Sequence, residues 1–264
     1  MKRILMCPPR YYDVCYVINP WMQGNLGKVD KQQAQRQWQQ LHGIVSKLAQ
    51  VRLVEPVEGL PDMVFTANAG LVRGNKVIVS SFLHAERQPE AQHFDKYFSS
   101  QGYRVYHLQQ GTIFEGAGDA LFDASGRLWL GSGVRSDAHA LHGIKAVFDV
   151  DVHALELINP HWYHLDTCFC PLPDGHALAY DRAFSARSVA ALSDTFGKNI
   201  FWVSEQDAND FACNAVVIGS TVILHKASDR LKQTLAQRGF EVVESEMSEF
   251  LKAGGSCKCL TLEI

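Results

Sequence analysis

One structural unit recurs along the whole chain of 264 residues. Apolar residues at helical spacing predict helices at residues 30–50, 90–101, 136–147, 183–196 and 229–237. Each predicted helix is followed by a short run of β-branched and aromatic residues, which is typical of strands, at residues 51–55, 103–108, 152–157, 199–204 and 240–244. The chain is therefore organised as five helix–strand pairs.

Hairpin-like segments separate these pairs and are predicted at residues 64–80, 120–130, 167–179 and 211–224. A glycine marks the turn of each hairpin: Gly74, Gly126, Gly175 and Gly219, which are 52, 49 and 44 residues apart. A spacing this regular is typical of repeat folds, in which each unit buries its apolar face against its neighbours.

The two ends of the chain complete the fifth unit. Residues 258–264 are all that remains for its first hairpin strand, and the chain opens with an unpartnered apolar strand at residues 2–7. We expect these ends to pair, so that five strand–strand–helix–strand units close into a ring around a central axis. An ordinary mixed α/β sheet is the alternative. No Pro/Gly/Ser-rich linker divides the chain, so we expect one domain over residues 1–264.

Polar residues recur in step with the repeat, at positions where a core pattern would favour apolar ones. Asn68, Glu115, His164 and Cys259 are separated by 47, 49 and 95 residues, the last being about twice the length of one unit. Taken singly, each has an ordinary structural interpretation, such as a turn residue or a small buried thiol. In a closed ring, however, all four would face the axis, and this common register predicts an active site.

These residues lie in four ordered segments. They read Phe-Thr-Ala-Asn-Ala-Gly at 65–70, Phe-Glu-Gly-Ala-Gly-Asp at 114–119, His-Leu-Asp-Thr at 164–167 and Gly-Gly-Ser-Cys-Lys-Cys-Leu-Thr at 254–261. Together they resemble the guanidino-group-modifying superfamily of arginine deiminases, dimethylargininases, amidinotransferases and arginine dihydrolases. The resemblance covers essentially the whole chain. It implies a five-bladed, pseudo-fivefold α/β propeller (pentein) of ββαβ units, in agreement with the repeat.

The resemblance also implies roles for the polar residues. It makes Cys259 the nucleophile, whereas Cys257 falls outside the catalytic position and would share a strand face with it. A guanidinium carbon is a poor electrophile, so a thiolate must attack it while a carboxylate, here Glu115, holds the cation. His164 would protonate the leaving ammonia or amine and then activate a water molecule. Asp166 can contact either the guanidinium or the histidine.

Four further residues are predicted to bind the rest of the substrate. Arg87 and Arg135 resemble family positions that bind an α-carboxylate through a bidentate fork. Asn19 lies in the segment Tyr-Val-Ile-Asn-Pro-Trp at 16–21, which resembles arginine dihydrolases. Asp119 ends the second motif and is placed with the substrate-binding residues. This chemistry needs no metal and no cofactor, so we expect none.

Asn68 distinguishes the subgroups. Deiminases and dimethylargininases usually present an acid at this position, and the Phe-Thr-Ala-Asn pattern resembles arginine dihydrolases, which take arginine through citrulline to ornithine, ammonia and carbon dioxide. A neutral amide tolerates both a charged guanidinium and a neutral ureido group. We therefore expect a hydrolase of free L-arginine, an arginine dihydrolase or a deiminase. A dimethylarginine dimethylaminohydrolase and an amidinotransferase are the alternatives.

Composition limits the setting in which the chain works. The formal net charge of -3 provides no positive field for a phosphate backbone, so we expect no nucleic-acid partner. The apolar run at residues 4–7 ends at Pro8-Pro9 and is too short for a signal peptide or a membrane span. Seven cysteines, an odd number, favour reduced thiols over a disulfide framework. We expect a cytoplasmic protein with a small-molecule substrate, and an oligomer is compatible with the sequence.

Two rival interpretations come from other classes of protein. A ribosome anti-association factor family shares the fivefold architecture but lacks the catalytic set. A structural zinc site is the second rival, since two Cys-x-Cys pairs supply four thiolates, although zinc sites usually space paired cysteines by two to four residues. Its ligands would be Cys168, Cys170, Cys257 and Cys259.

Overall fold

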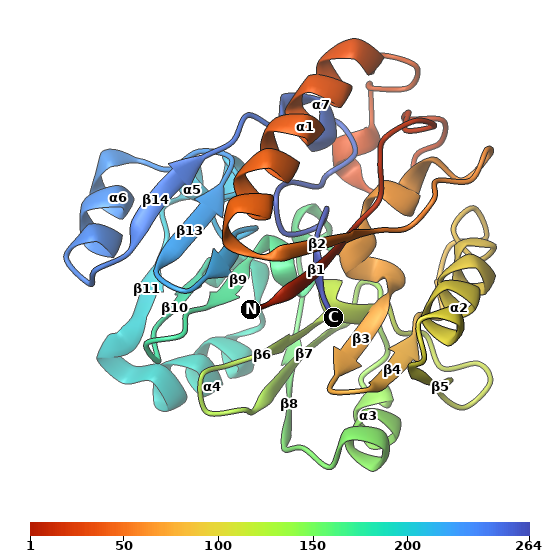
Figure 1. Ribbon diagram of the computed structural model, residues 1–264. Coiled ribbons are helices and arrows are strands. Elements are labelled where there is room, and N and C mark those ends of the chain that lie inside the picture. The colour runs from red at the N-terminus through yellow and green to blue at the C-terminus, as the bar shows by residue number, and fades with distance from the viewer.

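The computed structural model describes residues 1–264 as short strands and peripheral helices around a central axis (Figure 1). The strands are β1 (Arg3–Met6), β2 (Gln50–Leu53), β3 (Gly70–Arg73), β4 (Lys76–Val79), β5 (Arg104–Tyr106), β6 (Ala120–Phe122), β7 (Leu128–Ser132), β8 (Val152–Glu156), β9 (Phe169–Pro171), β10 (Ala177–Ala179), β11 (Ile200–Trp202), β12 (Val216–Ile218), β13 (Thr221–Leu224), β14 (Glu241–Glu244) and β15 (Leu262–Glu263). The helices are α1 (Lys31–Leu48), α2 (Glu90–Ser100), α3 (Ala140–Phe148), α4 (Ala186–Phe196), α5 (Glu205–Asn209), α6 (Asp229–Ala236) and α7 (Ser248–Leu251).

These strands form five three-stranded sheets of one design, with orders β15–β1–β2, β3–β4–β5, β6–β7–β8, β9–β10–β11 and β12–β13–β14. In each sheet the middle strand pairs antiparallel with the first strand and parallel with the last, as β4 does with β3 and β5. A parallel partner requires a crossover, which a helix provides here. The helices lie on the outside of the ring in Figure 1.

The two chain ends close this ring. Strand β1 pairs antiparallel with β15, with Ile4 opposite Glu263 and Leu5 opposite Leu262, and it pairs parallel with β2. The N- and C-termini therefore lie side by side near the centre of Figure 1. The predicted propeller of five ββαβ units, with paired termini, is confirmed.

The local sequence explains why these elements form. The side chain of Asp30 caps α1 by accepting a hydrogen bond from the backbone N–H of Gln33, and one face of the helix is buried through Trp38, Leu41 and Val45. Burial of each such side chain stabilises the fold by roughly 1.5–3 kcal/mol. The predicted hairpin glycines adopt positive φ angles, 61° at Gly74 and 84° at Gly126, which other residues rarely adopt.

Near the axis the structure departs from the predicted strands. Residues 64–69 and 211–215 were expected to begin hairpins, but they form turns, and the strands start only at Gly70 and Val216. Residues 257–260 also form a turn, so the expectation that Cys257 and Cys259 share one face of a strand is wrong. In these segments the backbone N–H and C=O groups form hydrogen bonds within turns or to neighbouring blades. These groups are therefore not available for the regular hydrogen bonds between paired strands. The short helices α5 and α7 were not predicted.

The remaining apolar side chains fill the space between the sheets and their helices. Three buried clusters, of 30, 22 and 21 residues, account for this core. No helix in the structure is long and apolar enough to cross a membrane.

Candidate active site

A short turn from each blade reaches the axis. Three of these turns are 3-10 helices that directly precede the first strand of a blade: Thr66–Ala69, Gly116–Gly118 and Leu165–Thr167. The turns at 211–214 and 257–260 hold the same position before β12 and β15. The predicted residues Asn68, His164 and Cys259 lie on or beside these turns. Because each turn holds the same position in its blade, these residues recur along the sequence in step with the repeat.

Hydrogen bonds link each turn to the next around the ring. The Asn68 amide donates to the Glu115 carbonyl at 2.9 Å, and the Leu165 N–H donates to the Asp119 carboxylate at 3.0 Å. The Asn214 amide donates to the Asp166 carbonyl at 3.0 Å. The circle is completed by bonds of 3.2 Å from the Lys258 N–H to the Asn214 carbonyl and 3.0 Å from the Ala67 N–H to the Cys259 carbonyl. Closure of the ring therefore fixes the relative positions of the site residues.

Glu115 and His164 form the first half of the site. His164 Nε2 lies 2.6 Å from Glu115 Oε2, and Arg135 Nη1 donates to the same oxygen at 2.9 Å. All three side chains are buried. Burial alone would raise the pKa of Glu115, but the charge of Arg135 and the hydrogen bond from His164 outweigh it and hold this pKa well below its usual range. Glu115 is thus a carboxylate bonded to the histidine, and its other oxygen accepts from the Leu83 N–H at 3.1 Å. Its expected contact with the guanidinium stays a prediction.

Cys259 and Asp166 form the second half. The Cys259 thiol lies 3.4 Å from Asp166 Oδ2, and the Asn214 amide donates to Cys259 Sγ at 3.1 Å. Burial, followed by the nearby Asp166 carboxylate, raises the pKa of Cys259 well above its usual value. Burial also raises the pKa of Asp166 to about 6, although the charge of Lys258 opposes that rise. Burial and the Asp166 charge therefore favour the thiol form of the cysteine, and a cation beside Asp166 would favour its thiolate.

The side chain of Asn68 is held between Arg87 and the backbone of Glu115. Its Oδ1 accepts a hydrogen bond from Arg87 Nη1 at 3.1 Å, while its Nδ2 donates to the Glu115 backbone. Arg87 also forms two bonds of 2.9 Å with the buried carboxylate of Glu90. This arrangement fixes the amide orientation. A Cβ atom on the neighbouring Gly118 would overlap the Asn68 amide nitrogen, so only glycine fits beneath it.

A small cavity lies beside these groups, although Glu115, His164 and Asp166 are not part of its lining. Its lining includes Cys259, Asn68, Arg87, Arg135 and Asn19, so it gathers five of the predicted site residues. Arg135 donates to Glu115 and to the Ile18 carbonyl, which leaves three of its five donors unused. Arg87 lies in the same cavity, mostly engaged with its own carboxylate partner. Binding of a substrate carboxylate by the two arginines stays a prediction.

The segment before α1 covers this cavity. Asn19 Oδ1 accepts hydrogen bonds from the N–H groups of Trp21 and Met22, and its Nδ2 donates to the Ala253 carbonyl at 3.0 Å. The Trp21 indole donates to the His161 carbonyl at 2.6 Å. Asn19 therefore holds the covering segment in place as well as lining the cavity, and its contact with the substrate stays a prediction.

Asp119 lies behind the cavity. Its Oδ1 accepts from the Leu165 N–H and its Oδ2 accepts from the Ser136 hydroxyl at 2.6 Å, so both oxygens are engaged. Burial raises its pKa to about 6, and the proximity of His164 opposes the rise. In this position Asp119 supports the turn that carries His164, and a direct contact with the substrate stays a prediction.

Sequence reasoning missed two residues of the site. Asn214 contacts Cys259 twice, and the gap of 95 residues between His164 and Cys259 was the signal for it, because one unit in that interval contributed no site residue. Asp62 also lines the cavity, buried, with Oδ1 unpartnered and Oδ2 accepting from the Tyr16 hydroxyl at 3.0 Å. No repeat-based signal pointed to Asp62.

The zinc alternative finds no support in the arrangement of side chains. No group of three or more His, Cys, Asp or Glu side chains is placed so that it could hold a metal ion. Cys259 is bonded to Asn214 and Asp166, and Cys170 Sγ donates to the Ala215 carbonyl at 3.9 Å. The four-cysteine site is therefore not formed.

The fold and this site define a class: five-bladed α/β propellers whose axial turns carry a buried cysteine and a histidine bonded to a carboxylate. A sequence model of the eukaryotic N,N-dimethylarginine dimethylhydrolase family matches residues 18–264. The N(G),N(G)-dimethylarginine dimethylaminohydrolase of Mycobacterium tuberculosis is 41% identical over 264 residues, which cover 100% of this chain and 86% of that protein. The chain belongs to the dimethylarginine dimethylaminohydrolase family.

Some members of this group are longer proteins. The bifunctional arginine dihydrolase/ornithine cyclodeaminase AgrE of Nostoc sp. is 50% identical over 264 residues, which cover 99% of this chain but only 38% of AgrE. The crystal structure of the N-terminal domain of ArgZ, a cyanobacterial arginine dihydrolase, was solved as a cysteine-to-serine mutant bound to substrate. It has a TM-score of 0.98 and 49% identity, and the match covers 100% of this chain and 98% of that one.

Proposed function

We propose that this chain is an arginine dihydrolase, which hydrolyses free L-arginine to ornithine, ammonia and carbon dioxide through covalent intermediates on Cys259. The observation that carries this proposal is the fixed amide of Asn68, which lines the cavity where a deiminase would present an acid. Relatives support it: a mutant of AgrE was crystallised with L-arginine, and 99% of this chain matches that structure at 50% identity.

The first stage is a deimination. The guanidinium lies against the Asp166 carboxylate, and its charge lowers the pKa of the Cys259 thiol, whose proton passes to His164. The thiolate forms a C–S bond to the guanidino carbon, the bond to one terminal nitrogen breaks, and His164 supplies the proton with which ammonia leaves. His164 then removes a proton from water, the water attacks the carbon, and the C–S bond breaks to give citrulline.

The second stage repeats the chemistry on a neutral group. Cys259 attacks the ureido carbon of citrulline, the bond to the terminal nitrogen breaks, and ammonia leaves with a proton from His164. One water then displaces the sulfur, and the resulting carbamate of ornithine breaks down to ornithine and carbon dioxide. A carboxylate at position 68 would have to be desolvated beside a ureido oxygen, whereas the Asn68 amide both donates and accepts hydrogen bonds. Glu115 and Arg135 keep His164 oriented through both stages.

The amino-acid end of arginine has complementary groups in the same cavity. The unused donors of Arg135 suit the α-carboxylate. The unpartnered Oδ1 of Asp62 is a buried acceptor that suits the α-ammonium group. We further propose that the enzyme acts in the cytoplasm, where thiols stay reduced, since all seven cysteines are free.

Hydrolysis of dimethylarginine is the second candidate, and the family match favours it. One experiment separates the possibilities: purified protein is incubated with arginine, citrulline and asymmetric dimethylarginine, and the amino-acid products are quantified, with Cys259→Ala as control. A dihydrolase forms ornithine from both arginine and citrulline. Citrulline as the final product of arginine indicates a deiminase, and preferential conversion of dimethylarginine indicates the second candidate.

A further inference from the structure

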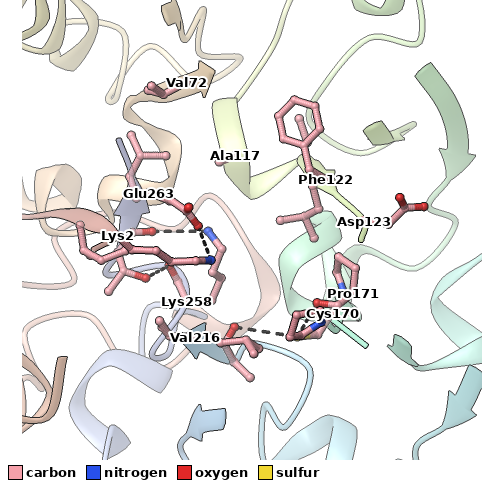
Figure 2. Close-up of a pocket in the computed structure, with 18 of the residues that line it drawn as sticks. Lys2, Val72, Ala117, Phe122, Asp123, Cys170, Pro171, Val216, Lys258 and Glu263 are labelled. Atoms are coloured by element: carbon pink, nitrogen blue, oxygen red, sulfur yellow. Dashed lines mark hydrogen bonds and ion pairs between the residues drawn. The ribbon is translucent and has the colours of Figure 1, made fainter. Parts of the chain in front are cut away.

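A second cavity of the protein lies apart from the active site. Its volume is about 720 Å³, and of the polar residues described above at the active site only Lys258 lines it. It lies at the other end of the propeller axis, where the termini meet, and Figure 2 shows Lys2, Lys258 and Glu263 on one side of it and Phe122, Asp123 and Pro171 on the other. The exposed side chains of Lys2 and Glu263 mark its rim, so solvent reaches it.

The charged groups of this cavity are unbalanced. Its two acidic side chains are paired, because Glu263 pairs with Lys2 at 2.8 Å and Asp123 pairs with Arg127 at 3.1 Å. Lys258, in contrast, forms no ion pair, and its ammonium has only the Thr261 carbonyl as a partner, at 3.4 Å. Arg73, also in the lining, has an aromatic ring beneath its guanidinium and no carboxylate partner. Lys258 and Arg73 therefore give the cavity positive charge that no acidic side chain of its own lining neutralises.

The rest of the wall is apolar. Of the 28 lining residues 17 are hydrophobic, and they come from every blade of the propeller. A volume of this size lies within the range of small-molecule sites, roughly 300–1,000 Å³. An unpaired ammonium beside an apolar wall is complementary to a molecule that joins a hydrocarbon body to an anionic head.

We propose that this second cavity is a binding site for a small apolar carboxylate, with the carboxylate paired to Lys258 and the hydrocarbon body against Leu121, Phe169 and Val217. Phosphate alone would pair with the Lys258 ammonium but would leave the apolar wall exposed to water. A carboxylate with a hydrocarbon chain is therefore the better match. The site is distinct from the cavity beside Cys259 and does not depend on the proposed function, although Lys258 directly precedes Cys259 and its charge acts on Asp166.

Hexanoate is a suitable probe, with hexan-1-ol as its uncharged analogue and the complete chain as the receptor. Calorimetry and ligand-observed NMR are expected to detect hexanoate binding, and Lys258→Met is expected to weaken it about tenfold or more, equivalent to about 1.4 kcal/mol. Val217→Glu, which adds a negative charge to the wall, is expected to weaken it likewise. Hexan-1-ol should lose little affinity in Lys258→Met.

The matched control is Lys198→Met, the same change at an exposed lysine outside the cavity, which should bind hexanoate as the wild type does. Circular dichroism checks that each variant is folded. Three results would overturn the proposal: no hexanoate binding to the wild type, equal binding to the wild type and Val217→Glu, or displacement of hexanoate by ornithine, which would place it in the catalytic cavity.

Discussion

Asn214 forms hydrogen bonds with both the side chain and the backbone of Cys259. The Asn214 Nδ2 donates to the Cys259 sulfur at 3.1 Å, and the Asn214 Oδ1 accepts from the Cys259 backbone N–H at 3.2 Å. Asn214 is itself fixed by the turn at Phe211, whose φ of 57° is rare for a residue other than glycine. A donor aimed at the sulfur stabilises the thiolate more than the thiol. Asn214 therefore positions the cysteine and favours its reactive form.

Asn214→Asp tests this relationship. The change keeps the acceptor for the backbone N–H but replaces the donor to sulfur with a negative oxygen, so the thiolate is disfavoured. We expect kcat/KM for arginine to fall about 100-fold or more, the usual effect of losing one preorganised donor. The rate of Cys259 alkylation by iodoacetamide should fall with it. Asn209→Asp, the same change on the exposed face of α5, is the control, and equal alkylation rates in the two variants would refute the role of Asn214.

Glu115→Gln tests the buried ion pair. The variant leaves Arg135 buried without its carboxylate, and such a loss typically destabilises a protein by about 3–5 kcal/mol. Thermal or denaturant unfolding should show this loss together with a fall in kcat, since His164 loses its orienting partner. Glu205→Gln removes an exposed pair with Arg182 and should cost about 1 kcal/mol or less. A similar small cost for Glu115→Gln would mean that the pair does not hold the site together.

Asp166 gives the reaction an acidic limit. Its pKa of about 6 lies above the ordinary value of 3.8 because the carboxyl is buried, so its charge is lost as the pH falls through about 6. The neutral acid cannot hold the guanidinium. We expect kcat/KM for arginine, which reports the free enzyme, to fall about tenfold per pH unit below this point. In Asp166→Asn, kcat/KM for arginine should be lower than in the wild type and should not show this fall below about pH 6. A wild-type profile that is flat to pH 5 would contradict the assignment.

The same raised pKa predicts that Asp166 lowers the stability of the fold at neutral pH. The folded state keeps this proton more tightly than the unfolded state does, so stability falls as the pH rises from about 4 to about 6 and stays lower above it. A difference of about two pKa units corresponds to about 3 kcal/mol. In urea unfolding, Asp166→Asn should therefore be more stable than the wild type at pH 8, by up to that amount, and no more stable at pH 4. A less stable variant at pH 8 would disprove this.

Much of the architecture was predictable because it is repetitive. The turn glycines, the helical periodicity and the unpartnered strands at both ends specify five units and their closure, and the β1–β15 pair confirms it. The same register brought Asn68, Glu115, His164 and Cys259 to the axis. Each of these signals depends on spacing along the chain, which a single sequence contains.

The details of the site depended on contacts between blades, which spacing does not encode. The sequence left Asp166 free to pair with the histidine or the guanidinium, and the structure pairs Glu115 with His164 and Asp166 with Cys259. The apolar or small residues around Cys259 predict a strand, whereas the backbone bonds of residues 257–260 to neighbouring blades make this segment a turn. Asp62 lies on a turn without any periodic signal.

The central claim is that Cys259 attacks the guanidino carbon of arginine. The direct measurement is mass spectrometry of wild-type protein quenched with acid during turnover of arginine, followed by peptide mapping. We predict an adduct with the mass of arginine less ammonia on the peptide that contains Cys257 and Cys259. It should persist in Cys257→Ser and be absent in Cys259→Ser. An adduct that survives Cys259→Ser, or ornithine formation by that variant at the wild-type rate, would contradict the claim.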